Sequence, residues 1–254
     1  MTQRVGAIVL GLLAWVWVCG GTAQAEQVQV AVAANFVPPF KEIAVEFQKA
    51  TGHTAELSAG SSGKFYAQIK NGAPFEVFFS ADEERPKLLE EEGLGVKGSR
   101  FTYAVGRLVL WSPDPELVKG EQTLQSDTFK HLAIASPKTA PYGMAAMQAM
   151  TNLKVWDRLQ PKIVQGENLG QTSGFIQSGN AELGFLALSQ VIDPALKGKG
   201  SRWDVPTSLH DPLAQDVVLL TKGQGNPAAK ALMEFVRGPR GLQIIERYGY
   251  DVKK

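Results

Sequence analysis

The stretch VQVAVAANFVPPFKEIAVEFQKATG (28–52) decides the fold, because its hydrophobic period changes from strand-like to helix-like within a few residues. Apolar residues alternate over 28–33, as in a half-buried strand. Pro38-Pro39 then opens a helix, and Gly52 ends it. The apolar face of this predicted helix comprises Phe40, Ile43, Ala44 and Phe47. The stretch is therefore typical of a strand followed by a helix that packs on it.

The same alternation of strand and helix recurs along the next 40 or so residues. A second strand is predicted at 55–59, followed by a helix after Ser62. A third strand at 75–80 precedes a helix at 84–92. Such a β-α-β-α-β-α series indicates an α/β fold with a mostly parallel sheet and helices on its faces.

The rest of the chain adds more units of the same kind, and residues 103–111 predict one longer strand. The other predicted elements are strands at 132–136, 163–164, 183–188 and 217–221, with helices starting near 142, 169 and 226. We predict two lobes, 26–105 plus 216–254 and 106–215, joined by two crossing segments that act as a hinge. Ligand would bind in the cleft between them.

The first 25 residues are typical of a secretion signal. Arg4 supplies the basic start, 5–18 the apolar stretch, and Ala23-Gln24-Ala25 a small-x-small cleavage site. Bulky residues precede Cys19, so we predict cleavage after Ala25 rather than lipidation, and a periplasmic product. Cleavage removes the only cysteine, which excludes a disulfide or a cysteine-based metal site.

The charge balance and the histidine spacing further limit which classes of function are possible. Removing Arg4 from the 26 basic residues leaves 25 against 25 acidic ones. This balance argues against nucleic-acid binding. His53, His131 and His210 lie far apart in sequence and do not have metal-ligand spacing. We therefore expect neither a cofactor nor a direct metal ligand.

Four predicted strand-to-helix junctions suggest an anion site. They are Ala34-Asn35, Ser61-Ser62, Pro141-Tyr142-Gly143 and Glu167-Asn168-Leu169. Each helix start offers unpaired N–H groups and a positive dipole end. Taken singly, each junction is most simply explained by ordinary capping. Our hypothesis is that all four face one cleft. Ser58 and Phe65 depart from the phosphate-binding loop pattern, which points away from a nucleotide.

The junctions suit a fully deprotonated, tetrahedral dianion, which offers hydrogen-bond acceptors only. Neutral donors held in place by the fold replace the water shell of such an ion. Phosphate keeps a proton at neutral pH and would lack an acceptor for it here. Selectivity among fully ionised dianions would then depend on the size of the cavity.

Several runs together resemble the periplasmic molybdate-binding proteins of ABC transporters. These runs are AANF (33–36), GSSGKFYAQIKNGAPFEVFFSAD (60–82), GENLGQTSGFIQSGNAELGFLALSQV (166–191) and HDPLAQDVVLL (210–220). The resemblance implies a two-lobed, type II periplasmic-binding-protein fold that closes on molybdate or tungstate. It also implies a monomer that performs no catalysis and delivers the ion to a membrane permease.

Carried over by position, the resemblance places the oxyanion contacts at Ala34, Asn35, Ser62, Tyr142 and Leu169. Ser62 would use its hydroxyl and N–H, and Asn35 its N–H and its amide. The other three would give backbone N–H groups only. The family also uses a hydroxyl at position 34, or a tyrosine at position 187. Both positions hold alanine here, which puts the contact at Ala34 in question.

Two alternatives remain open at this point. One is a receptor for sulfate, thiosulfate or another oxyanion, which cavity size would distinguish. The other is an exported phosphatase or esterase that uses Ser61 or Ser62 as nucleophile. Such an enzyme needs a general base within hydrogen-bond reach, and His53 and Asp82 are the candidates nearby in sequence.

Overall fold

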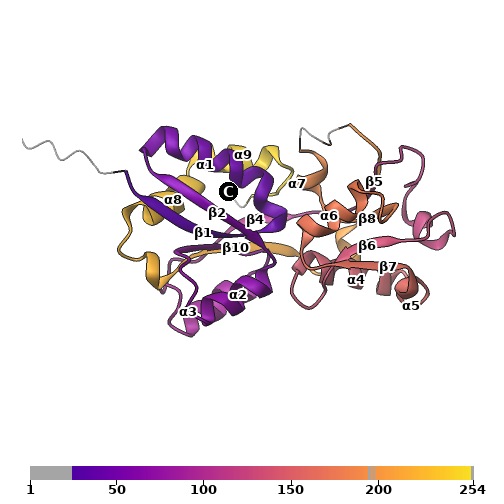
Figure 1. Cartoon of the computed structure of the whole chain (residues 1–254), viewed down its shortest axis with the longest axis horizontal. Helices are drawn as coiled ribbons and strands as arrows, with labels where there is room; N and C mark the ends of the chain where they lie inside the picture. Colours follow the sequence, from indigo (N-terminus) through magenta and orange to yellow (C-terminus); the bar gives the residue numbers. More distant parts are fainter. Residues whose placement is uncertain (1–24, 194–195, 197, 253–254) are drawn as a thin grey trace, which may run out of the picture.

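The protein folds into two five-stranded sheets that lie side by side, each with helices packed against it (Figure 1). This computed structural model describes residues 25–193, 196 and 198–252. Apart from Ala25, the predicted secretion signal lies outside the described residues, as does Cys19. The predicted two-lobed α/β fold with two flanked sheets is confirmed.

The first sheet has the strand order β2-β1-β3-β10-β4. β1 is parallel to β2 and β3, whereas β10 is antiparallel to both β3 and β4. One strand of this sheet is thus reversed and the other four run the same way. The strand bounds are β1 (Gln27–Ala33), β2 (Thr54–Gly60), β3 (Val77–Phe79), β4 (Phe101–Gly106) and β10 (Leu213–Leu219).

The second sheet repeats this plan, with the order β7-β6-β8-β5-β9. β6 is parallel to β7 and β8, and the reversed strand is β5, which is antiparallel to β8 and β9. In both sheets the reversed strand is the first one after the chain crosses over from the other sheet. The strand bounds are β5 (Leu108–Ser112), β6 (Leu132–Ala135), β7 (Ile163–Gly166), β8 (Leu183–Ala187) and β9 (Ser201–Asp204).

Helices cover both sheets, and most of the longer ones follow the carboxyl ends of parallel strands. The α-helices are α1 (Val37–Thr51), α2 (Ser62–Lys70), α3 (Glu84–Glu91), α4 (Pro141–Asn152), α5 (Trp156–Leu159), α6 (Leu169–Gln177), α7 (Leu188–Val191), α8 (Pro227–Arg237) and α9 (Pro239–Arg247). Short 3₁₀ helices are η1 (Ala34–Phe36), η2 (Glu121–Gln125), η3 (Gln160–Lys162), η4 (Thr207–Leu209) and η5 (Thr221–Gly223). No helix among the described residues is long and apolar enough to cross a membrane.

The prediction of one long strand over 103–111 is wrong. The chain leaves the first sheet at Gly106 and enters the second at Leu108, so β4 and β5 belong to different sheets. The apolar run continues because both strands are buried, each in its own sheet. Hydrophobic periodicity reports burial, and it does not reveal a change of sheet. The predicted lobe boundaries at 105 and 216 stay a prediction.

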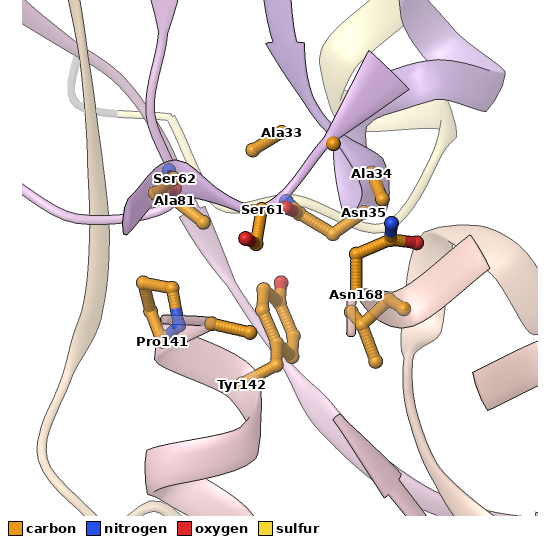
Figure 2. A pocket seen from close by; sticks show the side chains of 12 residues that line it. Ala33, Ala34, Asn35, Ser61, Ser62, Ala81, Pro141, Tyr142 and Asn168 are labelled. Carbon is orange, nitrogen blue, oxygen red and sulfur yellow. Dashed lines mark hydrogen bonds between the residues drawn. The ribbon is translucent and has the colours of Figure 1, made fainter. Parts of the chain in front are cut away.

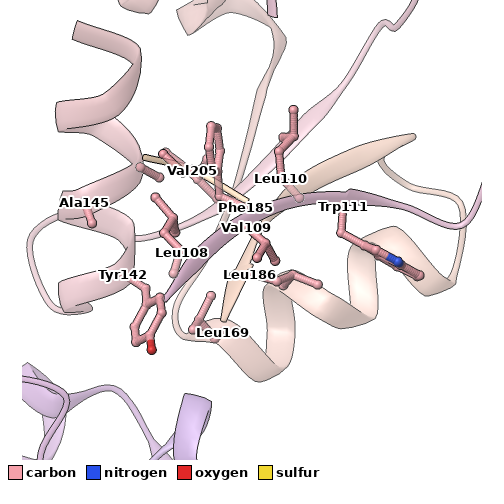
Figure 3. Close-up of a cluster of buried hydrophobic side chains, with 14 of the residues drawn as sticks. Leu108, Val109, Leu110, Trp111, Tyr142, Ala145, Leu169, Phe185, Leu186 and Val205 are labelled. Carbon is pink, nitrogen blue, oxygen red and sulfur yellow. The ribbon is translucent and has the colours of Figure 1, made fainter. Parts of the chain in front are cut away.

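Each sheet has its own apolar core, and the two halves also touch. The core of the second sheet is built on β5, β6 and β8 and includes Leu108, Leu110 and Phe185 (Figure 3). The same cluster reaches Ala33 and Ala81 of the first sheet. The strand ends of both sheets therefore meet across a closed interface, where the candidate site lies.

Candidate functional site

One pocket lies where the strand ends of the two sheets face each other. It contains all five predicted contact residues, which come from both halves of the molecule (Figure 2). The lining residues are Ala33, Ala34, Asn35, Gly60, Ser61, Ser62, Ala81, Ala140, Pro141, Tyr142, Asn168 and Leu169. The structure thus brings the four predicted strand-to-helix junctions together around a single space.

Helix starts point at this pocket from both sides. Ser62 is the first residue of α2, Tyr142 the second of α4 and Leu169 the first of α6. Asn35 lies in η1, directly before α1. N–H groups in a first helical turn have no acceptor within the helix. Within the described part of the chain, those of Ser62, Tyr142 and Leu169 also donate to no other backbone carbonyl. They remain as donors, reinforced by the positive helix ends.

Local sequence fixes these helix starts in place. Pro141 occupies the first turn of α4, where its missing N–H costs nothing. The Asn168 side chain caps α6, because its Oδ1 accepts from the N–H of Gly170 at 2.9 Å and of Gln171 at 3.1 Å. Capping consumes the N–H groups of the second and third helical residues, and Leu169 N–H stays unengaged.

The Ser62 hydroxyl accepts a hydrogen bond from the chain segment that follows β3, at the same edge of the sheet. Its Oγ accepts from the backbone N–H of Ala81 at 2.9 Å, and the residue is only 1% exposed. Because a lone pair of Oγ is occupied by this N–H, the hydroxyl proton is directed elsewhere. The hydroxyl of Ser62, which lines the pocket, therefore keeps a proton that it can donate to another acceptor.

The side-chain amide of Asn35 is engaged away from the pocket. Its Nδ2 donates to Gln215 Oε1 at 2.7 Å and to the hydroxyl of Tyr250 at 3.0 Å. Both protons of the amide are thus used, and Asn35 has only its backbone N–H to offer a ligand. The carbonyl oxygen of Asn35 accepts from Ser189 Oγ at 2.7 Å, which ties this junction to the other half of the molecule.

The Tyr142 hydroxyl belongs to the same buried network. It accepts from Gln215 Nε2 at 3.1 Å, while the ring lines the pocket. In Figure 3, Tyr142 and Leu169 lie at the edge of the apolar core. Burial raises the pKa of Tyr142 well above the ordinary tyrosine value, and it raises the pKa of Tyr250 to about 12. These tyrosines therefore stay neutral at physiological pH and add no negative charge near the pocket.

The raised pKa of Tyr250 predicts a loss of stability in alkali. An unfolded tyrosine ionises near pH 10, whereas Tyr250 in the folded protein ionises at about 12. The folded state thus holds its proton longer, and the free energy of unfolding falls as the pH rises from about 10 to 12. A rise of about two pKa units at Tyr250 contributes about 3 kcal/mol to this fall. Urea unfolding across this range, with tyrosinate absorbance as the probe, should show no such fall below about pH 9.

The pocket is small and uncharged. In this closed form its cavity volume is about 10 Å³, close to the least that accommodates one water molecule, so the pocket would have to widen even for a compact ion, and an organic solute is far too large. A larger hollow of about 400 Å³ adjoins it and shares Ala81, Ala140 and Pro141 with it. Four acidic residues and two basic ones line that hollow, namely Asp82, Glu83, Glu84, Asp211, Arg85 and Lys138. An anion would favour the smaller pocket, where no carboxylate faces it.

Contacts across the pocket rim hold the two halves together. The N–H of Gly63 donates to the carbonyl of Thr139 at 2.9 Å. Lys64 Nζ and Glu167 Oε2 form an ion pair at 2.5 Å, with both side chains about half exposed. An exposed pair of this kind contributes at most about 1 kcal/mol. The structure is therefore a closed form with modest links at its rim.

The candidate general bases do not line the pocket. His53 Nδ1 accepts from the N–H of Glu26 at 3.1 Å, at the far end of β1 and β2. Asp82 Oδ1 accepts from Ser80 Oγ at 3.1 Å and from the N–H of Arg85 at 3.1 Å. Neither group forms a hydrogen bond with Ser61 or Ser62 among the described contacts. This geometry gives the hydrolase alternative no support.

Sequence reasoning missed part of the pocket. Ala81 follows the central strand β3, and the carboxyl ends of β1, β2 and β3 share one edge of the sheet. The sequence does predict a strand at 75–80, and the residue that follows it could have been placed at this edge by the same rule. The sequence places Ser61 in a capping junction and makes it one possible nucleophile of the hydrolase alternative. Its side chain lies in the pocket, and no sequence pattern reports where an N-cap side chain points.

Comparison with known proteins identifies relatives over almost the whole chain. Residues 28–251 match the family model for bacterial extracellular solute-binding proteins. The molybdate-binding protein of Azotobacter vinelandii is 50% identical over 254 residues, covering 100% of this chain and 98% of that protein. That of Rhodobacter capsulatus is 49% identical, covering 98% and 96%. The predicted resemblance is confirmed.

Solved structures agree at the level of the fold. The periplasmic molybdate-binding protein of Azotobacter vinelandii aligns with a TM-score of 0.86 and 42% identity, covering 89% of this chain and 100% of that one. The sulfate-binding protein of Mycobacterium tuberculosis aligns with a TM-score of 0.71 but only 13% identity, covering 90% and 87%, which shows the fold alone. The chain therefore belongs to the bacterial extracellular solute-binding protein family.

Proposed function

We propose that this protein is a periplasmic receptor that captures molybdate or tungstate between its lobes and delivers it to a membrane ABC permease. It works as a monomer and catalyses no reaction. The relatives of about 50% identity are molybdate-binding proteins, which supports the choice of ion. The observation that carries the proposal is the pocket itself: small, uncharged and surrounded by helix starts.

Backbone N–H groups from both halves would hold the ion. Ser62 gives its N–H and its hydroxyl, and Asn35, Tyr142 and Leu169 give their N–H groups. Ala34 lines the pocket and would contribute its N–H at most, because alanine has no side-chain donor. A dianion that offers only acceptors matches a pocket that presents donors. The metal centre of the ion is reached only through its oxygen atoms.

Closure of the two halves would complete the site. Ser62 and Asn35 belong to one half, and Tyr142 and Leu169 to the other. The two crossings, near Gly106 and between β9 and β10, would act as the hinge. An open form would present each set of donors to water, and binding would pull the halves together. The closed interface described above supports this motion.

Isothermal titration calorimetry against molybdate, tungstate, sulfate and phosphate tests the proposal. We expect molybdate and tungstate to bind at least about 100-fold more tightly than sulfate, which corresponds to about 2.8 kcal/mol. The ground for this order is that the relatives of about 50% identity are molybdate-binding proteins. Phosphate should not bind measurably, because its proton finds no acceptor. Tight sulfate binding without molybdate binding would refute the choice of ion and leave the receptor class standing.

A further inference from the structure

The hydroxyl group of Ser61 has no assigned role in the proposed site. Ser61 is 3% exposed and lines the pocket. Among the described residues that line this pocket, its Oγ is the buried side-chain polar atom without a hydrogen-bond partner. A buried hydroxyl left unpaired costs about 1–3 kcal/mol. Such an atom calls for an explanation, and a bound ligand supplies one.

Helix capping does not explain Ser61. The residue is the N-cap of α2, with extended backbone (φ −86°, ψ 149°), which is the usual setting for a capping serine. Its side chain nevertheless accepts no bond from the helix. Figure 2 shows that the side chain points into the space above Pro141 and Tyr142. The hydroxyl is thus directed across the pocket towards the other half of the molecule.

The other polar side chains of the pocket are already engaged. Asn35 donates both amide protons to Gln215 and Tyr250. Asn168 Oδ1 caps α6, and the Tyr142 hydroxyl accepts from Gln215. The Ser62 hydroxyl accepts from the N–H of Ala81. Among the described residues that line the pocket, Ser61 alone combines burial, direction into the pocket (Figure 2) and a hydroxyl with no partner of its own.

We propose that Ser61 Oγ donates a hydrogen bond to the bound oxyanion, so that adjacent serines at the start of α2 supply two hydroxyl donors. This inference rests on the proposed function, because it names a further contact in the same site. Bonds from a neutral hydroxyl to an anion are stronger than those between neutral groups. The second hydroxyl makes up for Ala34 and Ala187, which provide no side-chain donor. It also places one more donor on the half of the site that contains Ser62.

Calorimetric titration of the Ser61→Ala and Ser61→Gly variants tests this contact. Each is titrated with the ion among molybdate, tungstate and sulfate that the wild-type protein binds most tightly. We expect the dissociation constant to rise about 10- to 100-fold in both variants. The melting temperature without ion should stay equal to that of the wild type or rise slightly, because the lost hydroxyl makes no cap bond. Ser58→Ala, in β2 and outside the pocket, is the matched control and should leave affinity unchanged.

The possible outcomes separate this contact from a capping role. If Ser61 only caps the helix, Ser61→Ala lowers the melting temperature and leaves affinity unchanged, which overturns the inference. Glycine is nearly as good a cap as serine, so Ser61→Gly keeps the test valid if the alanine variant folds poorly. If the wild-type protein binds an ion and both variants bind it equally well, this inference alone fails. If the wild type binds none of the three ions, both the proposed function and this inference are wrong.

Discussion

Replacing Ser62 with aspartate should abolish oxyanion binding. A carboxylate at this position stands at the positive end of α2, among the N–H groups that would otherwise hold the ion. It acts as a tethered competitor and also repels a dianion. Placing like charges together costs several kcal/mol, so we expect affinity to fall by at least about 1000-fold. Calorimetry with molybdate measures this loss directly.

The alanine variant of Ser62 should give a smaller loss of affinity than the aspartate variant. Ser62→Ala removes one hydroxyl donor and leaves the buried N–H of Ala81 without its acceptor. The expected loss of binding free energy is about 1.5–3 kcal/mol, the range for a hydrogen bond to a charged group. Ser58→Ala again serves as the control. Wild-type affinity in Ser62→Ala, with the fold intact, would remove this hydroxyl from the site.

Replacing Gly143 with alanine should damage both stability and binding. A Cβ at this position would lie 2.2 Å from the carbonyl oxygen of Ala135, at the end of β6. This contact is a clash with backbone atoms, which cannot change rotamer as a flexible side chain can. The start of α4 must therefore move away from the sheet. Overpacking of this kind costs about 1–3 kcal/mol of the free energy of unfolding. The shift also displaces the N–H of Tyr142, and we expect molybdate affinity to fall at least about 10-fold, a loss of about 1.4 kcal/mol.

Gly174, within α6, provides the matched control for Gly143. A Cβ there meets no atom within 4 Å. Because alanine favours a helix over glycine, Gly174→Ala should stabilise the protein by about 0.5–1 kcal/mol and leave affinity unchanged. Urea unfolding and calorimetry distinguish the two variants. If Gly143→Ala behaved like Gly174→Ala, close packing of α4 on β6 would not be what positions Tyr142.

The position of the site along the chain could be predicted because it depends on local signals. The alternating strand at 28–33 and the small residues at 60–63 mark junctions between a strand and a helix. Parallel strands bring such junctions to one edge of a sheet. The gathering of Asn35, Ser62, Tyr142 and Leu169 in one pocket follows from that rule applied to each half. Their contact with an ion stays a prediction.

The role of each side chain could not be predicted, because it depends on partners far away in sequence. The Asn35 amide is engaged by Gln215 and Tyr250, which lie 180 and 215 residues further on. Gln215 also interrupts the apolar pattern, so strand β10 was predicted from 217 although it begins at Leu213. Gln215 is fully buried because its amide is satisfied on both sides, by Asn35 and by Tyr142. Periodicity detects apolar burial and misses polar burial of this kind.

The small volume of the closed pocket has a kinetic consequence. At about 10 Å³ the closed pocket has space for about one water molecule, so it must widen to admit even a single oxyanion, and it has no room for two at once. If the ion binds here as proposed, exchange would be dissociative: the halves separate, the bound ion leaves, and only then does a new ion enter. The residence time of the ion would then be set by the rate of opening, whatever other salts are present, and a permease that separates the halves would control release.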